Sequence, residues 1–199
     1  MPIFVPGQPG HHPLLLLHGT GGSERDLLPI ARFLDPAAPQ LSIGGRLEEN
    51  GQSRYFRHDV AGGFDQTDLA RETDWLMTTL TAELAANGLS GSDVIAVGYS
   101  NGANIAAHAI LTRPTPFAAG IFFHATTVAA DSSGPNLAEV PLWLSYGDHD
   151  PFVPSADFAT LVTRLRQRGA APTIYHHPHG HQLTHSELAA ARSWLQEGV

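Results

Sequence analysis

The chain has 199 residues, and its 11 lysines and arginines stand against 19 aspartates and glutamates, which gives a formal net charge of −8 at pH 7. This length is sufficient for one domain with a substantial core, and the 42% hydrophobic content excludes a generally disordered chain. The acidic balance argues against nucleic acid and anionic membranes as partners. Because the sequence has no cysteine, it excludes disulfides, thiolate metal ligands and a cysteine nucleophile.

The N-terminal segment predicts neither a targeting signal nor a membrane span. Its longest apolar run is the four leucines at 14–17, and no lysine or arginine precedes them. Such a run is too short for the apolar region of a signal peptide and far too short to cross a bilayer. We therefore expect a cytoplasmic protein.

Short apolar runs alternate with longer helical patterns along the rest of the chain. Strands are predicted at residues 14–17, 40–43, 94–99, 117–123, 142–146 and 173–176, with a reduced leading strand at 2–5. Helices are predicted at residues 25–34, capped by Ser23, and at 68–87, 103–111, 155–168 and 183–195. Residues 44–66 and 125–140 have no regular pattern.

This alternation is typical of an α/β fold in three layers, a doubly wound and mostly parallel sheet with helices on both faces. The predicted strands are almost continuously apolar, as expected when both faces of the sheet are covered. No internal repeat, linker or inserted cap is visible. We expect one compact domain over residues 1–199.

The sharpest local pattern is Gly98-Tyr99-Ser100-Asn101-Gly102, a G-x-S-x-G between a predicted strand and a predicted helix. Such a turn holds a serine at the carboxyl edge of the sheet, and the helix after it points its N–H groups at developing negative charge. A chance glycine-flanked serine is the alternative. The flanking strand and helix favour Ser100 as a nucleophile.

A serine nucleophile needs an imidazole base that a carboxylate orients, and in this fold the expected chain order is serine, acid, histidine. Asp148 and Asp150 both follow the predicted strand at 142–146, and the spacing leaves the choice between them open. The loop after the last strand offers His181 as the base, with His179 as its rival.

The other histidines are weaker candidates for the base, although the sequence has 12 of them. His18 and His58 precede Ser100, and His18 is expected to brace the loop that it begins. His108 and His185 fall on predicted helices. The crowded loop at 176–181 also has a metal interpretation, but adjacent imidazoles on an extended chain point apart. We therefore expect no metal and no cofactor.

Two backbone N–H groups are needed to bind the oxyanion that forms in ester hydrolysis. Asn101 follows the serine and supplies one, and Thr20 in the glycine-rich segment His18-Gly19-Thr20-Gly21-Gly22 supplies the other. A phosphate-binding loop is the alternative for this segment. It lacks the lysine of a P-loop and the glycine spacing of a dinucleotide site.

Four segments resemble the α/β-hydrolase superfamily, specifically its phospholipase/carboxylesterase branch, which includes the acyl-protein thioesterases. They are HGTGG at 18–22, GYSNGAN at 98–104, GDHDPFVP at 147–154 and GHQLT at 180–184. The wording of the second and fourth is most similar to small bacterial carboxylesterases of the hydroquinone-resistance type. The resemblance implies Asp150 as the acid, since it directly precedes Pro-x-Val-Pro, and His181 as the base.

The resemblance implies a serine carboxylesterase that works through an acyl-enzyme. The leading strands of a full hydrolase sheet are reduced here to residues 2–5 at most. The loop that helps acyl-protein thioesterases to bind lipid chains has no evident equivalent, which favours short-chain or small aromatic esters as the small-molecule substrate. A thioesterase or lysophospholipase-like hydrolase is the alternative, and a non-catalytic ligand-binding protein is a more remote one. A homodimer is possible. Phe64, Phe122, Phe123, Thr126 and Phe152 are candidates for lining the pocket.

Overall fold

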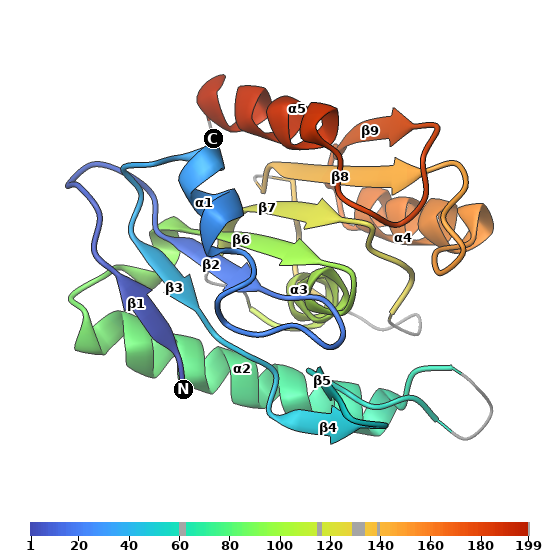
Figure 1. Cartoon of the computed structure of the whole chain (residues 1–199), viewed down its shortest axis with the longest axis horizontal. Coiled ribbons are helices and arrows are strands. Elements are labelled where there is room, and N and C mark those ends of the chain that lie inside the picture. The colour runs from blue at the N-terminus through green and yellow to red at the C-terminus, as the bar shows by residue number, and fades with distance from the viewer. Residues whose placement is uncertain (60–62, 115–116, 129–133, 139, 199) are drawn as a thin grey trace.

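A seven-stranded sheet forms the centre of the computed structural model, which describes residues 1–59, 63–114, 117–128, 134–138 and 140–198 (Figure 1). The strands are β1 (Ile3–Val5), β2 (Leu14–Leu17), β3 (Gln40–Ser42), β6 (Val94–Tyr99), β7 (Phe117–Phe123), β8 (Leu142–Gly147) and β9 (Thr173–His177), in the order β1-β3-β2-β6-β7-β8-β9. The edge strand β1 pairs antiparallel to β3, and the remaining pairs are parallel. This confirms the predicted fold class.

Helices cover both faces of the sheet, as Figure 1 shows. The helices are α1 (Leu28–Leu34), α2 (Gln66–Ala86), α3 (Asn101–Thr112), α4 (Ser155–Gln167) and α5 (His185–Gln196), and a short 3₁₀ turn, η1 (Gly91–Asp93), precedes β6. Strand β2 shows how the sequence builds the layers. Leu15 and Leu17 belong to the core cluster that includes residues of α2, α3 and α4, whereas Leu14 and Leu16 belong to the cluster that includes residues of α1 and α5, because successive side chains point to opposite faces.

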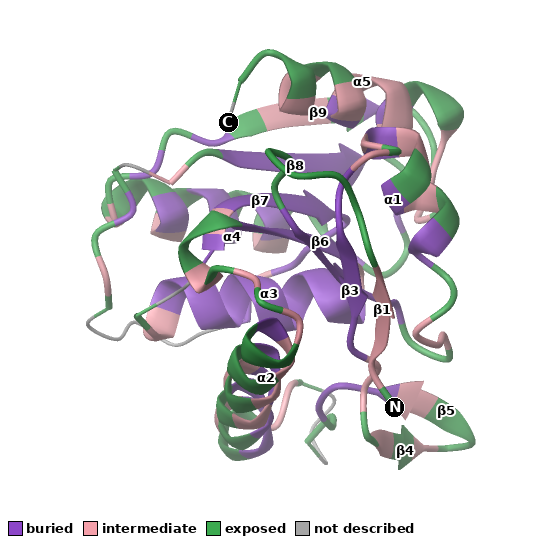
Figure 2. Ribbon diagram, turned by 90° about the vertical axis from the view of Figure 1, so that its left-hand side faces the viewer, coloured by how far each residue is buried: buried purple, intermediate pink, exposed green. Residues whose placement is uncertain are grey.

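The core is deepest around α3 and the central strands. Figure 2 shows α3 buried almost all round, while α2 presents an exposed outer face. The alanines at 103, 106 and 107 are fully buried, since small side chains let α3 lie close against the sheet. None of the helices in the described ranges is long and apolar enough to cross a membrane.

Residues 44–66 contain regular structure that the sequence analysis did not predict. A separate two-stranded hairpin, β4 (Leu47–Glu49) and β5 (Gln52–Arg54), turns at Asn50 and Gly51, which have φ angles of 53° and 74°. An Asn-Gly pair at a two-residue turn is a known hairpin signal, because both positions require positive φ. The strands were missed because their residues are polar and lack a clear alternation.

Four predicted helix starts were wrong. Helix α3 begins at Asn101, directly after Ser100, and not at 103. Helix α1 begins at Leu28 and not at 25, and Ser23 does not cap it, because the Ser23 hydroxyl donates to the Asp26 carboxylate in a turn before the helix. Helix α2 begins two residues early, because Asp65 caps it. Helix α5 begins at His185 after a capping box formed by Thr184 and Glu187.

Candidate active site

Ser100 lies on a tight turn between β6 and α3, at the carboxyl edge of the sheet. Its φ angle of 52° is in the left-handed region, which an L side chain adopts at a cost. A Cβ atom at Gly102 would lie 2.1 Å from the carbonyl oxygen of Leu17, and one at Gly98 would lie 2.6 Å from Ala103 Cα. Both glycines are therefore required by close backbone packing, and the turn presents the Ser100 hydroxyl to solvent.

The structure brings Ser100, His181 and Asp150 together from loops that follow three different strands. His181 Nε2 lies 2.8 Å from Ser100 Oγ, and His181 Nδ1 lies 2.7 Å from Asp150 Oδ2. Asp150 Oδ1 accepts the backbone N–H groups of Phe152 and Val153 at 2.8 and 3.1 Å. The acid is thus fixed by the turn that the Asp-Pro-Phe-Val segment makes.

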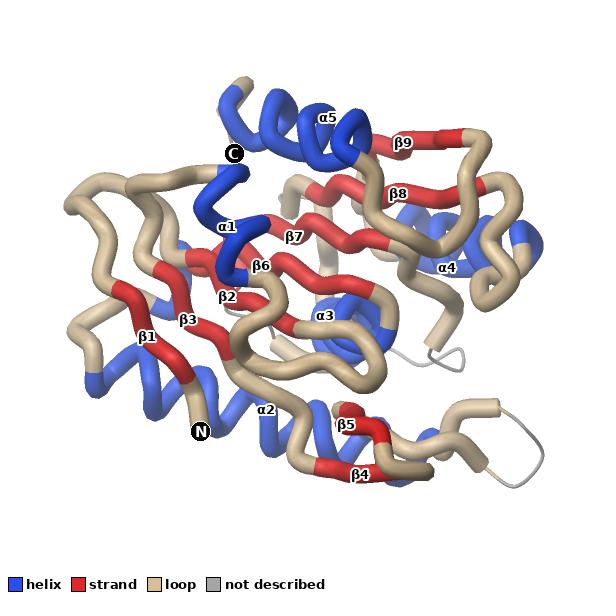
Figure 3. The backbone as a smooth tube through the Cα atoms, in the orientation of Figure 1, coloured by secondary structure: helices blue, strands red, loops and turns tan. Residues whose placement is uncertain are grey.

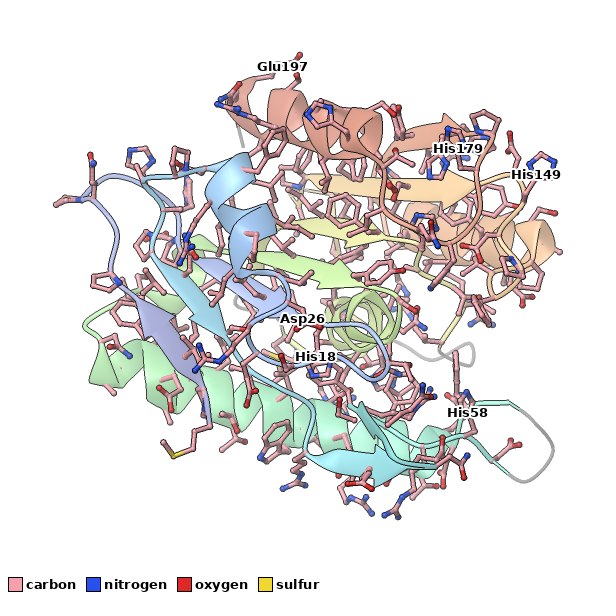
Figure 4. The ribbon with its side chains drawn as sticks, viewed as in Figure 1. His18, Asp26, His58, His149, His179 and Glu197 are labelled. Atoms are coloured by element: carbon pink, nitrogen blue, oxygen red, sulfur yellow. The ribbon has the colours of Figure 1, made fainter. Side chains whose placement is uncertain are left out.

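The two rival residues lie elsewhere. Asp148 is half-exposed and lies 3.3 Å from His176 Nδ1, so it pairs with a surface histidine. His179 lies near His149 at the outer edge of the molecule in Figure 4, and its ring contacts that of His177. The structure therefore places only Asp150 and His181, of these four choices, beside Ser100.

A second imidazole, His124, lies against the same carboxylate and was missed by the sequence analysis. It follows β7, is fully buried, and its Nδ1 lies 2.7 Å from Asp150 Oδ2. On its other side, His124 Nε2 lies 3.2 Å from Glu187 Oε1. Glu187 is also fully buried, and its other oxygen accepts the N–H of Thr184 at 3.1 Å. A polar residue at the carboxyl end of a parallel strand was the available signal.

The buried neighbours Glu187, His124, Asp150 and His181 shift one another's pKa values. Burial opposes the charged form of His124, but Glu187 and Asp150 outweigh it and raise the His124 pKa. Burial likewise opposes the Asp150 carboxylate, yet hydrogen bonds from His181, Phe152 and His124 lower its pKa. For His181, burial dominates and lowers the pKa, although Asp150 opposes that shift. A neutral His181 beside an ionised Asp150 can accept a proton from Ser100.

Tyr99 positions the backbone of His181. Its hydroxyl donates to the His181 carbonyl oxygen at 2.9 Å, and the two rings lie 5.3 Å apart between centroids. Burial raises the pKa of Tyr99 to about 12, with Asp150 and Glu187 adding to the shift. The phenol therefore stays protonated and keeps its hydrogen bond at neutral pH.

The segment 18–22 approaches the serine from β2 and is braced by its neighbours. His18 Nε2 accepts the Gly45 N–H at 3.0 Å, and the Tyr55 hydroxyl accepts the His18 N–H at 3.1 Å. The bracing role predicted for His18 is thereby confirmed. Asn101 is tied in from the other side, because its Oδ1 accepts the Tyr55 N–H at 2.8 Å. Thr20 and Asn101 line one pocket together with Ser100.

This pocket has a volume of about 490 Å³. Of the predicted lining residues, Phe64, Thr126 and Phe152 border it, and Phe152 is the most exposed at 72%. Phe122 and Phe123 were wrong choices, because both are fully buried within β7. Asn104, Gln52, Arg54 and His58 also line the pocket and were not predicted. Figure 3 shows the hairpin β4–β5 below the loops at the carboxyl ends of the sheet strands.

Two groups of side chains are close enough to hold a metal ion, His124 with Asp150 and His181, and His124 with His177 and Glu187. In the first group both histidines contact Asp150 at hydrogen-bond distance. In the second, the His179 N–H donates to His177 Nδ1 at 3.3 Å, which leaves the His177 proton on Nε2, toward Glu187. Hydrogen bonds therefore account for the first group, whereas His124 Nε2, His177 Nε2 and Glu187 Oε1 of the second are buried without a hydrogen-bond partner in the described structure.

His108 is a buried structural histidine on α3. Its Nδ1 lies 2.7 Å from Thr73 Oγ1, whose own proton is donated to the Leu69 carbonyl oxygen. His108 therefore donates to Thr73, and it joins α3 to α2.

Comparison with known proteins identifies the family of the chain. A family model described as phospholipase/carboxylesterase matches residues 58–198. The chain belongs to this family. The putative hydrolase MhqD of Bacillus subtilis (strain 168) is 38% identical over 186 residues, which cover 94% of this chain and 93% of MhqD.

Two solved structures agree with the fold. A carboxylesterase from Bacillus cereus is 34% identical, with a TM-score of 0.95 over 98% of this chain and 93% of the other. A structure of YahD with malic acid is 37% identical, with a TM-score of 0.95 over 99% of this chain and 98% of the other. By family, the chain is a hydrolase of the carboxylesterase kind.

Proposed function

We propose that the chain is a serine carboxylesterase that hydrolyses short-chain or small aromatic esters through an acyl-enzyme. The observation that carries this proposal is the pair of contacts at His181, 2.8 Å to Ser100 Oγ and 2.7 Å to Asp150 Oδ2. A base within hydrogen-bond reach of a hydroxyl, itself oriented by a carboxylate, is the arrangement that activates a serine.

In the acylation step, Ser100 Oγ attacks the ester carbonyl carbon while His181 Nε2 takes the hydroxyl proton. Asp150 keeps the His181 proton on Nδ1 and stabilises the imidazolium that forms. The backbone N–H groups of Thr20 and Asn101 bind the oxyanion of the tetrahedral intermediate. The intermediate collapses as His181 donates its proton to the departing alcohol oxygen.

In the deacylation step, His181 removes a proton from water, which attacks the acyl carbon of the Ser100 ester. The second tetrahedral intermediate breaks its bond to Ser100 Oγ, and His181 returns the proton to the serine. The cycle consumes one water and releases one alcohol and one carboxylic acid. Apart from the ester and water, every reacting group in this cycle belongs to the chain.

The pocket supports a small substrate. A volume of about 490 Å³ lies within the range of small-molecule sites, and its walls combine Phe64 and Phe152 with the polar Asn104 and Thr126. YahD was solved with malic acid, a small polar acid, and a ligand of that size accords with this pocket. Long acyl chains are expected to react poorly.

The test is hydrolysis of p-nitrophenyl esters from acetate to palmitate by the wild type and by Ser100→Ala. We expect the rate to be highest with short chains and to vanish in the variant. Ser92→Ala is the matched control, because Ser92 is exposed in the turn η1 and bonds to Ser90 and Asp93.

The outcomes separate the alternatives. Turnover that survives Ser100→Ala would overturn the proposed nucleophile. A maximum at long chains would favour a lysophospholipase-like activity, and faster turnover of thioesters than of oxygen esters with the same acyl chain would favour a thioesterase. Absence of turnover with every ester and thioester would favour a ligand-binding protein.

A further inference from the structure

A buried cation, Arg54, forms part of the wall of the Ser100 pocket. Its side chain is only 9% exposed, and it borders the pocket beside Gln52 and His58. Among the residues described by the structure, no aspartate or glutamate borders this pocket, although the chain as a whole carries a formal charge of −8. The described lining therefore includes a guanidinium cation and no carboxylate.

The position of Arg54 relative to the reacting atoms is fixed by its two neighbours in the chain. On one side, the Ser53 carbonyl oxygen accepts the Gly21 N–H at 2.9 Å, and the Ser53 hydroxyl donates to the Gly22 carbonyl oxygen. On the other side, the Tyr55 N–H donates to Asn101 Oδ1 at 2.8 Å. Strand β5 is thus clamped to both backbone segments that are proposed to bind the oxyanion.

The alternation of side chains along β5 directs Arg54 into the pocket. Successive residues of a strand point to opposite faces, so Gln52 and Arg54 share one face of β5 and Ser53 points to the other. Gln52 and Arg54 both border the pocket. The strand is held in place by the Ser53 hydroxyl and by the backbone of Ser53 and Tyr55, which leaves the face of Gln52 and Arg54 for a ligand.

The guanidinium is held in one orientation by groups at its edge. Arg54 Nε donates to the Phe56 carbonyl oxygen at 3.1 Å, and Arg54 Nη2 donates to His58 Nε2 at 3.2 Å. Glu49 Oε2 lies 3.6 Å from Arg54 Nε and 2.8 Å from His58 Nδ1. Glu49 is the counter-ion in this group, but it does not border the pocket.

This counter-ion balances the guanidinium charge incompletely. Burial lowers the pKa of Arg54, and the attraction of Glu49 opposes the shift without cancelling it. A buried cation gains most from an anion that can form parallel hydrogen bonds with its planar fork. The ligand atom suited to this wall is a carboxylate oxygen.

We propose that Arg54 is an anion subsite and that the ester substrate of this enzyme carries a free carboxylate. The inference rests on the proposed esterase function and names its substrate class, half-esters of dicarboxylic acids or esters whose alcohol bears a carboxylate. Arg54 Nη atoms hold the carboxylate, and the ester carbonyl then lies between Ser100 and the N–H groups of Thr20 and Asn101.

The first measurement compares substrates that differ only in this charge. p-Nitrophenyl hydrogen glutarate against p-nitrophenyl pentanoate tests a carboxylate on the acyl side, and 4-carboxyphenyl acetate against 4-methylphenyl acetate tests the alcohol side. The variants are Arg54→Gln, Arg54→Lys and, as the matched control, Arg57→Gln, whose side chain is exposed and does not border the pocket.

We expect Arg54→Gln to lower kcat/KM about 10- to 100-fold for one of the charged substrates, the loss of a charge-assisted hydrogen bond. The loss for the neutral partner ester is expected to be smaller than for the charged one. Arg54→Lys keeps the charge but not the fork, so an intermediate loss is expected. Equal losses on charged and neutral esters would reduce Arg54 to a brace for Phe56 and would overturn the proposal.

A binding measurement separates this inference from the proposed function. Calorimetry with Ser100→Ala and ethyl hydrogen glutarate, against ethyl pentanoate, needs no turnover. Binding of the charged ester that is lost in Ser100→Ala/Arg54→Gln supports the subsite even if no esterase activity is found. Equal binding of both esters, with activity intact, would overturn the subsite and leave the esterase.

Discussion

The Nδ1 atom of His124 lies 2.7 Å from Asp150 Oδ2, the same distance that separates this oxygen from His181 Nδ1. One carboxylate oxygen therefore faces two imidazoles that both border the pocket, His181 half-buried and His124 fully buried. Because His124 lies between Asp150 and Glu187, both of its ring nitrogens face carboxylates. We expect this ring to be an imidazolium and Glu187 to balance its charge.

The wild-type pH dependence is expected to reflect the depressed pKa of His181. Burial favours the neutral ring, so the base becomes available at a lower pH than an ordinary histidine would allow, below about 6.5. The kcat/KM for an uncharged ester is expected to rise with pH through this lowered value and then to remain level. An acidic limb at or above the ordinary histidine value would contradict the prediction.

Replacing His124 by glutamine is expected to move that acidic limb upward. The positive charge of His124 lowers the pKa of His181, so its removal raises the apparent pKa of the coupled His181 and Asp150 pair. The loss of a hydrogen bond to a charged carboxylate also loosens Asp150, and kcat is expected to fall about tenfold. The measurement is a pH–rate profile of the variant.

The matched control for this variant is His177→Gln. His177 lies 3.6 Å from Glu187 and makes ring contact with His124, but it has no contact with Asp150 among those described. Its replacement is expected to leave the acidic limb nearly unchanged. If both variants lower kcat equally with no shift in the limb, His124 acts only as a packing residue.

His108 is expected to make stability depend on pH. Burial and, secondarily, Arg113 lower its pKa from 6.5 to about 4, so the unfolded chain binds a proton in this window and the native protein does not. Stability therefore falls as the pH drops from about 6.5 toward 4. Between pH 7 and pH 5 the contribution is about 2 kcal/mol of unfolding free energy.

Urea unfolding at pH 7 and pH 5 measures this contribution. His108→Gln is expected to shrink the difference between the unfolding free energies at the two pH values. His149→Gln, which removes an exposed histidine, provides the comparison. The pKa of His124 is raised, so its contribution to stability changes with pH in the opposite direction to that of His108. The difference between the two variants is therefore more informative than the wild-type curve alone. An unchanged difference in His108→Gln would show that His108 is protonated in the native state.

The order of Ser100, Asp150 and His181 was predictable because each belongs to a local strand-to-loop pattern. The role of His124 was not, because it depends on Asp150 and Glu187, which lie 26 and 63 positions further along the chain. The choice of Asp150 over Asp148 came from family resemblance, since spacing alone left it open. The periodicity of the sequence therefore predicted most of the helices and strands, whereas the contacts between distant loops could be identified only in the folded structure.

The position of Arg54 in the pocket wall was also beyond prediction from the sequence alone. It lies in a polar segment with no clear period, and its burial arises only when β5 is clamped between the Gly21 and Asn101 segments. The Asn50-Gly51 turn would have indicated the hairpin but not what the hairpin approaches. Phe122 and Phe123 illustrate the opposite error, since an apolar ring next to a polar loop is more often part of the core.

Replacing Gly102 by alanine is expected to destabilise the protein and displace Ser100. The new Cβ would lie 2.1 Å from the Leu17 carbonyl oxygen, a backbone atom of a fully buried strand that cannot move aside easily. Overpacking of this kind costs about 1–3 kcal/mol, and roughly 2 kcal/mol corresponds to a Tm decrease of about 4–8 °C at this chain length. A separation of α3 from β2 would also lower kcat. Gly180→Ala is the comparison, because its Cβ would meet nothing closer than 3.4 Å; an equal Tm for the two variants would contradict the packing argument.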